Sequence, residues 1–95
     1  MPRNKPHLFG NCKQEHQFVL KDGNRLSSLF DLVSAMETMS DDVYGHHANE
    51  SRNDFSNWIK DVYQEGDLAD SVAKSPNRTQ TQLEILKALA SRIKR

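Results

Sequence analysis

The run at residues 53–66, NDFSNWIKDVYQEG, constrains the fold of this chain more than any other segment. Its large apolar side chains recur at helical spacing, and they are Phe55, Trp58, Ile59, Val62 and Tyr63. This spacing places them on one face of an amphipathic helix. Asn53 or Asp54 can cap its start, and Gly66 stands where a C′ glycine ends a helix. A chain of 95 residues needs its few aromatic residues in its small core, so we expect this face to be buried.

Two segments before this run have the same period. The first begins at a capping serine, Ser27 or Ser28, and should run to about residue 38. Its apolar stripe is Leu26, Leu29, Phe30, Val33 and Met36. Ser40 then offers another cap, followed by two aspartates in the first turn, where the helix dipole favours anions. We therefore predict a short second helix over residues 41–48.

Two segments after the run complete the helical part. Asp67 can cap a short helix with an inward face of Leu68, Ala69, Val72 and Ala73. Pro76 disfavours a helical conformation at the residue before it, so we expect a break there. Thr79 or Thr81 then opens the last helix. Its predicted core stripe is Leu83, Leu86, Leu89, Ala90 and Ile93.

The N-terminal part has a different pattern. Residues 1–15 contain two prolines, one glycine and no apolar period, which predicts a flexible arm. Residues 18–20 (FVL) are β-prone, and the pair at 22–23 (DG) signals a two-residue hairpin turn because glycine accepts a positive φ. We therefore predict one mainly α domain over residues 16–95. In this domain a short N-terminal β-hairpin packs on a bundle of about five helices, two of them short.

The net charge is zero, but the charges are unevenly distributed. Residues 26–70 contain ten acidic and two basic side chains, whereas residues 71–95 contain six basic and one acidic. These segments attract each other within the monomer or across a dimer, or else they bind oppositely charged partners. No apolar run approaches the ~18 residues of a membrane span, and no apolar stretch typical of a signal peptide follows the N-terminus. We therefore expect no membrane partner. The single cysteine cannot form an internal disulfide, which suits a reducing compartment, so we expect a cytoplasmic protein.

One combination of residues is more specific. In chain order its members are His46, His47, Asn49, Asn53, Asp54, Phe55, Trp58, Ile59, Asp61 and Val62. They form an HHxN…NDFxxW[IV]xDV pattern, and over residues 16–93 the chain resembles a small prokaryotic, largely archaeal domain of unknown function. Gly45 departs from the pattern, because a better helix former is expected there. The resemblance implies a binding or regulatory module rather than an enzyme.

His46 and His47 are the candidates for a metal site, because histidine is the commonest metal ligand. Adjacent residues on a helix point about 100° apart, so the two rings do not converge on one ion while the helix continues. We expect instead that His47 packs in the core and hydrogen-bonds Asn53 or Asp54, with the other ring exposed. An unpaired polar ring in the core would cost about 1–3 kcal/mol.

No motif for catalysis is present. The sequence has no phosphate-binding loop, no nucleophile elbow and no nucleophile–base pair. Asp54 and Asp61 share a helix face, but no glycine-rich loop lies near them. Cys12 and His16, with His7 upstream, lack the paired and closely spaced ligands of a zinc site. We therefore expect neither an enzyme nor a cofactor.

The remaining candidates divide into surface and core. Expected contact residues are Tyr44, Tyr63, Asp61, Lys87, Arg92 and Lys94. Expected core or capping residues are Phe30, Val33, His47, Asn53, Asp54, Phe55, Trp58, Ile59, Val62, Leu86 and Leu89. We predict a non-catalytic interaction or regulatory module that binds another protein or itself. The alternatives are nucleic-acid binding through the basic last helix and a small metal-binding domain through His46 and His47.

Overall fold

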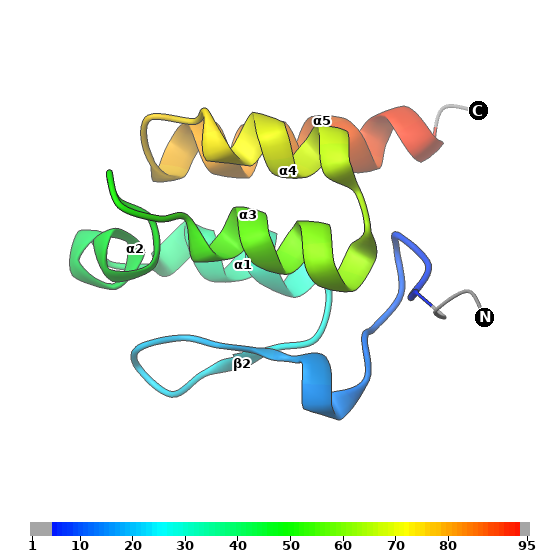
Figure 1. The fold of residues 1–95 in the computed structure, drawn as a ribbon, viewed down its shortest axis with the longest axis horizontal. Helices are drawn as coiled ribbons and strands as arrows, with labels where there is room; N and C mark the ends of the chain where they lie inside the picture. The colour runs from blue at the N-terminus through cyan, green and yellow to red at the C-terminus, as the bar shows by residue number, and fades with distance from the viewer. Residues whose placement is uncertain (1–4, 94–95) are drawn as a thin grey trace.

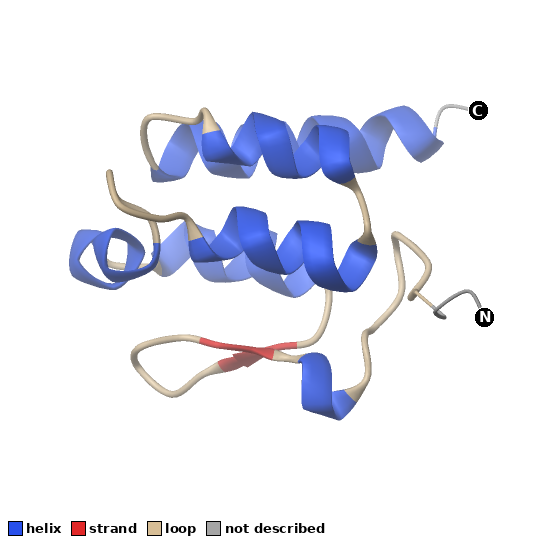
Figure 2. Ribbon diagram, in the orientation of Figure 1, coloured by secondary structure: helices blue, strands red, loops and turns tan. Residues whose placement is uncertain are grey.

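The computed structural model describes residues 5–93 of the chain and shows the predicted mainly helical fold with one hairpin (Figure 2). The predicted contact residue Lys94 lies outside the described part. The elements in order are η1 (Gln14–His16), β1 (Phe18–Val19), β2 (Arg25–Leu26), α1 (Leu29–Thr38), α2 (Asp41–His47), α3 (Asp54–Trp58), η2 (Ile59–Tyr63), α4 (Gly66–Ala73) and α5 (Arg78–Ile93). In residues 5–93 no helix is long and apolar enough to cross a membrane.

The elements form three layers (Figure 1). The hairpin and the N-terminal segment lie on one side, α1 and α3 lie in the middle, and α4 and α5 cover the other side. The core lies between these layers. Its side chains with no exposed surface include Leu29, Leu32, Met36, Phe55, Ile59, Val72 and Ile85. Each helix therefore buries one stripe against a neighbouring layer, as the helical periods predict.

Side-chain caps fix where three helices begin. The hydroxyl of Ser28 accepts a hydrogen bond from the backbone N–H of Asp31, at 3.0 Å. The hydroxyl of Ser40 caps α2 in the same way at 3.1 Å, and the Asn53 side-chain oxygen caps α3 at 3.0 Å. Each cap satisfies a backbone donor that has no partner inside its helix, and each was among the residues predicted to do so.

The hairpin is as predicted, but its turn is one residue longer. Phe18 pairs with Leu26 in antiparallel register, and the Leu20 N–H donates to the Asn24 carbonyl at 2.8 Å. The loop is therefore residues 21–23 rather than residues 22–23. Gly23 is its last residue and has a φ of +95°, the conformation that a three-residue hairpin loop requires at this position.

The end of the third helix differs from the prediction. The last turn of this helix is the π-helical η2, and the chain leaves it at Gln64 in the left-handed conformation, with a φ of +56°. Gly66 does not end a helix but begins α4. Asp67 is accordingly inside α4, and the residue before the helix, Glu65, makes no side-chain cap. The helix therefore ends at the π turn and the left-handed Gln64, two residues before the glycine.

The last helix is rotated relative to the predicted stripe. Leu86, an expected core residue, is 43% exposed, Leu83 is 45% exposed and Ile93 is 68% exposed. Ala90 is exposed as well. The side chains that α5 turns inward are instead Thr81, Ile85 and Leu89. Only Leu89 of the predicted stripe is therefore a buried core residue.

Two hydrogen bonds from α5 to α1 accompany this rotation. The Arg78 guanidinium donates to the Met36 carbonyl, near the C-terminal end of α1. The Gln82 amide donates to the Val33 carbonyl at 3.1 Å. These bonds hold the 78 and 82 side of α5 against α1, and with Ile85 and Leu89 buried in the core the leucines at 83 and 86 are left exposed. Phe30, also an expected core residue, is 44% exposed beside them on α1.

The N-terminal segment packs on the domain from residue 5 onward. Leu8 and Cys12, which fall within the predicted arm, are core residues with 6% and 9% exposure. The Cys12 N–H donates to the Ser27 carbonyl at 2.7 Å. The packed domain therefore does not begin at residue 16 as predicted, because the small core includes apolar side chains from the segment before that residue.

Candidate functional site

His47 connects three elements at the end of α2. Its Nε2 accepts a hydrogen bond from the backbone N–H of Lys21, in the hairpin loop, at 3.0 Å. Its Nδ1 lies 3.0 Å from a carboxylate oxygen of Asp54, the first residue of α3. Because Nε2 is the acceptor, the ring N–H is at Nδ1 and donates a hydrogen bond to Asp54. His47 therefore joins the hairpin to α3 with only 6% exposure.

Aromatic rings surround His47 and form a cluster that we call the aromatic corner: Phe18, His47, Phe55, Trp58 and Tyr63. Phe18 lies 5.0 Å from both His47 and Phe55, measured between ring centroids. The indole N–H of Trp58 donates to the His16 carbonyl at 2.7 Å, and the side chain is 8% exposed. These edge-to-face and stacked contacts stabilise the corner beyond the burial of apolar area alone.

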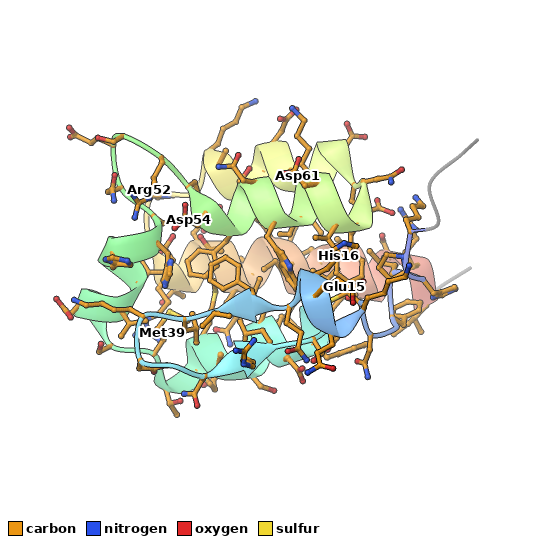
Figure 3. All side chains as sticks on the ribbon, turned by 60° about the horizontal axis from the view of Figure 1, so that its bottom comes forward. Glu15, His16, Met39, Arg52, Asp54 and Asp61 are labelled. Carbon is orange, nitrogen blue, oxygen red and sulfur yellow. The ribbon has the colours of Figure 1, made fainter. Side chains whose placement is uncertain are left out.

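The predicted histidine pair shows no metal-site geometry. His46 is exposed, and its ring stands nearly perpendicular to that of His47, at 89°. Both nitrogens of His47 already have hydrogen-bond partners. Arg52 also binds the Asp54 carboxylate, at 3.2 Å, where the loop enters α3 (Figure 3). Over residues 5–93 no group of three or more His, Cys, Asp or Glu side chains could hold an ion.

Tyr63 is not the surface residue that we expected. It is 1% exposed, and its hydroxyl lies 2.8 Å from the Gly10 carbonyl and 3.2 Å from the Ser27 carbonyl. The π turn directs this side chain inward, where it fastens the N-terminal segment to the core. Burial raises the pKa of Tyr63, and burial likewise raises the pKa of Cys12.

The other expected contact residues are distributed over several surfaces. Tyr44 is half-buried, and its hydroxyl lies 2.7 Å from that of Thr81 on α5. Asp61 is exposed on η2 (Figure 3). Val33 and Val62, expected in the core, are both partly buried against it. The structure does not bring the tyrosine, the aspartate and the basic residues of α5 together into one patch.

The basic side chains of α5 contact acidic or carbonyl groups of the same chain. Lys87 Nζ lies 3.4 Å from a carboxylate oxygen of Glu84, one turn earlier. Arg92 lies 2.9 Å from the carboxylate of Glu65, which precedes α4. Arg78 turns toward α1, as described above. These pairs reduce the positive field that the last helix presents to solvent.

The least expected surface is apolar and spans two helices. Phe30 and the half-buried Val33 on α1, with Leu83, Leu86 and Ile93 on α5, form what we call the α1/α5 face. The helices run antiparallel, because Arg78 meets Met36 and Gln82 meets Val33. One turn further along, Leu86 is level with Phe30. Phe30 in turn stacks on Phe9, at 5.9 Å between ring centroids, which extends the face toward the N-terminal segment.

The sequence contains a signal for this face. The last helix has two apolar stripes rather than the single stripe that was predicted. The buried stripe is Thr81, Ile85, Ala88 and Leu89, and the exposed one is Leu83, Leu86, Ala90 and Ile93. The second has the alternating three- and four-residue spacing of a helix–helix seam. A helix with two such stripes is expected to contact two surfaces.

Comparison with known proteins finds no match: no protein-family model, no curated protein and no solved structure corresponds to this chain. Function is therefore inferred from the geometry of the chain itself. Two features of that geometry stand apart. The aromatic corner has its polar groups paired inside the fold, whereas the α1/α5 face presents apolar side chains to solvent.

Proposed function

We propose that this protein is a non-catalytic protein-interaction module and that the α1/α5 face is its contact surface. The observation that carries the proposal is the position of the exposed apolar side chains. Five large hydrophobic residues are exposed in the described part of the chain, and four of them lie on this face. Isolated exposed hydrophobic residues are common, but a group at helical spacing marks an interaction site.

The surroundings of the face support the same function. Glu37 and Gln82, hydrogen-bonded at 2.6 Å, lie at one edge, and Lys87 lies at the other. An apolar centre with a polar rim is the usual composition of a protein–protein contact, because the centre excludes water and the rim sets the orientation. The described part of α5 is also rigidly held by its other side, so the face is ordered before a partner binds.

The other functions receive less support. A general base needs a free acceptor nitrogen, whereas Nε2 of His47 accepts the Lys21 N–H. A metal would have to displace both hydrogen bonds of that ring. Nucleic acid would have to compete with Glu84 and Glu65 for Lys87 and Arg92. We also propose a cytoplasmic location, which suits the free and buried Cys12 thiol.

Site-specific photo-crosslinking in cells that produce the full chain tests the proposed function. The crosslinking amino acid replaces Leu86 in one variant and Val19 in the other, because Val19 is equally exposed, at 47%, but lies on the hairpin. We expect a protein adduct from position 86 and none from position 19. The adduct is identified by mass spectrometry, and the purified partner should bind the chain but not its Leu83→Glu variant. Equal adducts from both positions, or none from position 86, would contradict the proposal.

A further inference from the structure

We infer that the partner on the α1/α5 face is a second copy of this chain, packed antiparallel about a two-fold axis that passes between the two α5 helices near Leu86. This inference rests on the proposed function and names its partner. Three properties of the face lead to it: the symmetry of its apolar stripe, the polarity of its charges and its size.

The exposed stripe of α5 is complementary to itself when it is reversed. In an antiparallel pair centred at Leu86, this leucine packs on Leu86 of the second copy. Leu83 then lies level with residue 89 of the second copy, and its nearest neighbour on the exposed stripe there is Ala90, so that a large side chain meets a small one in both halves. Alternating three- and four-residue spacing over the described part of α5 supplies the knobs and holes of such a seam. Phe30, level with Leu86 on α1, lies at the edge of the same contact.

The charges beside the face differ between its two ends. Glu37 and Asp41 lie near the end where α1 stops and α2 begins, and both are exposed. At the opposite end, Lys5 and Arg92 share the single carboxylate of Glu65, at 3.8 Å and 2.9 Å.

Lys5 and Arg92 also line, together with Phe9, a shallow hollow that adjoins the face. One end is thus acidic and the other carries an excess of positive charge. A two-fold antiparallel arrangement brings the acidic end of each copy to the basic end of the other. A parallel arrangement would place like charges together, so the polarity favours the antiparallel one.

The size of the face predicts a weak and reversible dimer. The 16 residues of α5 give a length of about 24 Å at 1.5 Å per residue. Two helices about 10 Å apart give a width of roughly 20 Å, and hence a footprint of roughly 500 Å². Stable dimers bury about 800 Å² on each partner, so this contact belongs to the smaller, transient class. We expect a dissociation constant in the micromolar range or weaker.

Sedimentation equilibrium of the purified full chain, from about 1 µM to about 1 mM, measures this association over the range that the footprint predicts. The expected result is a concentration-dependent mixture of monomer and dimer. Leu86→Glu should weaken the dimer by at least about 30-fold, because it places two carboxylates at the two-fold axis. Val19→Glu is the matched control and should leave the dimer unchanged. Circular dichroism establishes that both variants remain folded.

Two further variants, each with a matched control, test the arrangement of the dimer. Glu37→Lys should weaken it several-fold and more at low salt, whereas Glu50→Lys, exposed on the loop after α2, should not. Leu86→Cys in a Cys12→Ser background should form an interchain disulfide with oxidised glutathione, which is reduced to two thiols. Val19→Cys in the same background should not. A dimer that Leu86→Glu disrupts but that does not crosslink at position 86 would overturn the antiparallel arrangement.

Failure of this inference differs from failure of the proposed function. A chain that stays monomeric at every concentration overturns the second copy as partner. Photo-crosslinking at position 86 then separates the remaining cases. If position 86 forms an adduct with a different protein, and Leu83→Glu abolishes the binding of that protein, the α1/α5 face is still an interaction surface but its partner is not a second copy. The absence of any adduct removes both proposals.

Discussion

The aromatic corner and the α1/α5 face both consist largely of apolar side chains, but the corner buries them and the face exposes them. In the corner, the rings of Phe18 and Phe55 stack in the core, and His47 and Trp58 have partners for their ring N–H groups. On the face, large aliphatic side chains stand beside a paired polar edge and remain exposed. The corner therefore contributes mainly to stability, and the face is available for association.

Two leucines on α5 show how small the structural difference is. Leu86 and Leu89 are three residues apart, yet the first is 43% exposed and the second 2% exposed. They have the same chemistry and the same helix propensity. The rotation of the helix, which buries Ile85 with Leu89, assigns one to the core and the other to the surface.

The largest expected effect is in the aromatic corner. Trp58→Ala should lower the free energy of unfolding by about 3–5 kcal/mol, because it leaves a cavity and removes the bond to the His16 carbonyl. That is a large fraction of the total stability of a small domain. Urea denaturation followed by circular dichroism measures the change, since the variant has no tryptophan to report fluorescence. A change below about 0.5 kcal/mol would mean that the corner does not hold the layers together.

The two leucines of α5 give the next test. Leu89→Ala should cost about 2–5 kcal/mol, whereas Leu86→Ala should change the stability of the monomer by no more than about 0.5 kcal/mol. The same substitution in the same helix removes differences of helix propensity from the comparison. Urea denaturation at low protein concentration keeps association out of the measurement. Equal costs at both positions would contradict the observed rotation of α5.

A smaller effect is expected at the two histidines. His47→Phe leaves the Lys21 N–H without its acceptor and should cost about 1–3 kcal/mol. His46→Phe is the matched control, and we expect a change within about 0.5 kcal/mol because that ring is exposed. Amide hydrogen exchange at Lys21 supplies a local readout, and it should become faster in the first variant alone. Unchanged exchange there would show that His47 does not hold the hairpin.

The smallest effect depends on pH. Burial raises the pKa of Tyr63 in the native state, whereas an unfolded tyrosine ionises near about pH 10. Above that pH the unfolded chain loses a proton that the native chain keeps, so stability should fall as the pH rises. Tyr63→Phe should cost about 0.5–1.5 kcal/mol at neutral pH through its lost hydrogen bond.

The alkaline loss of stability should then be less steep in Tyr63→Phe than in the parent chain. The Cys12 pKa is raised for the same reason, but the thiol is present in both proteins and its contribution cancels in the comparison. Thermal unfolding between about pH 8 and pH 11 records the two slopes, a range that spans the ordinary pKa values of both groups. Parallel slopes would show that the Tyr63 hydroxyl is ionised equally in both states.

Most of the fold follows from local sequence patterns. The cap at Ser40 was predicted from residue type and position alone, and Ser28 and Asn53 were each one of two predicted candidates, because capping depends on a few neighbouring atoms. The hairpin followed from a β-prone run and one turn glycine. The exposed apolar face was not found, because periodicity shows that a stripe exists but not whether the fold covers it.

The amino-acid sequence by itself determined most of the helices, the presence of the hairpin and the apolar periods of the helices, since all of these depend on contacts within a few residues. Only the tertiary structure decided which stripe of α5 is buried and where Tyr63 points. Those outcomes depend on hydrogen bonds between segments far apart in the chain, from Arg78 to Met36 and from Tyr63 to Gly10. Such bonds exist only where the layers meet, and local spacing alone leaves several orientations nearly equivalent.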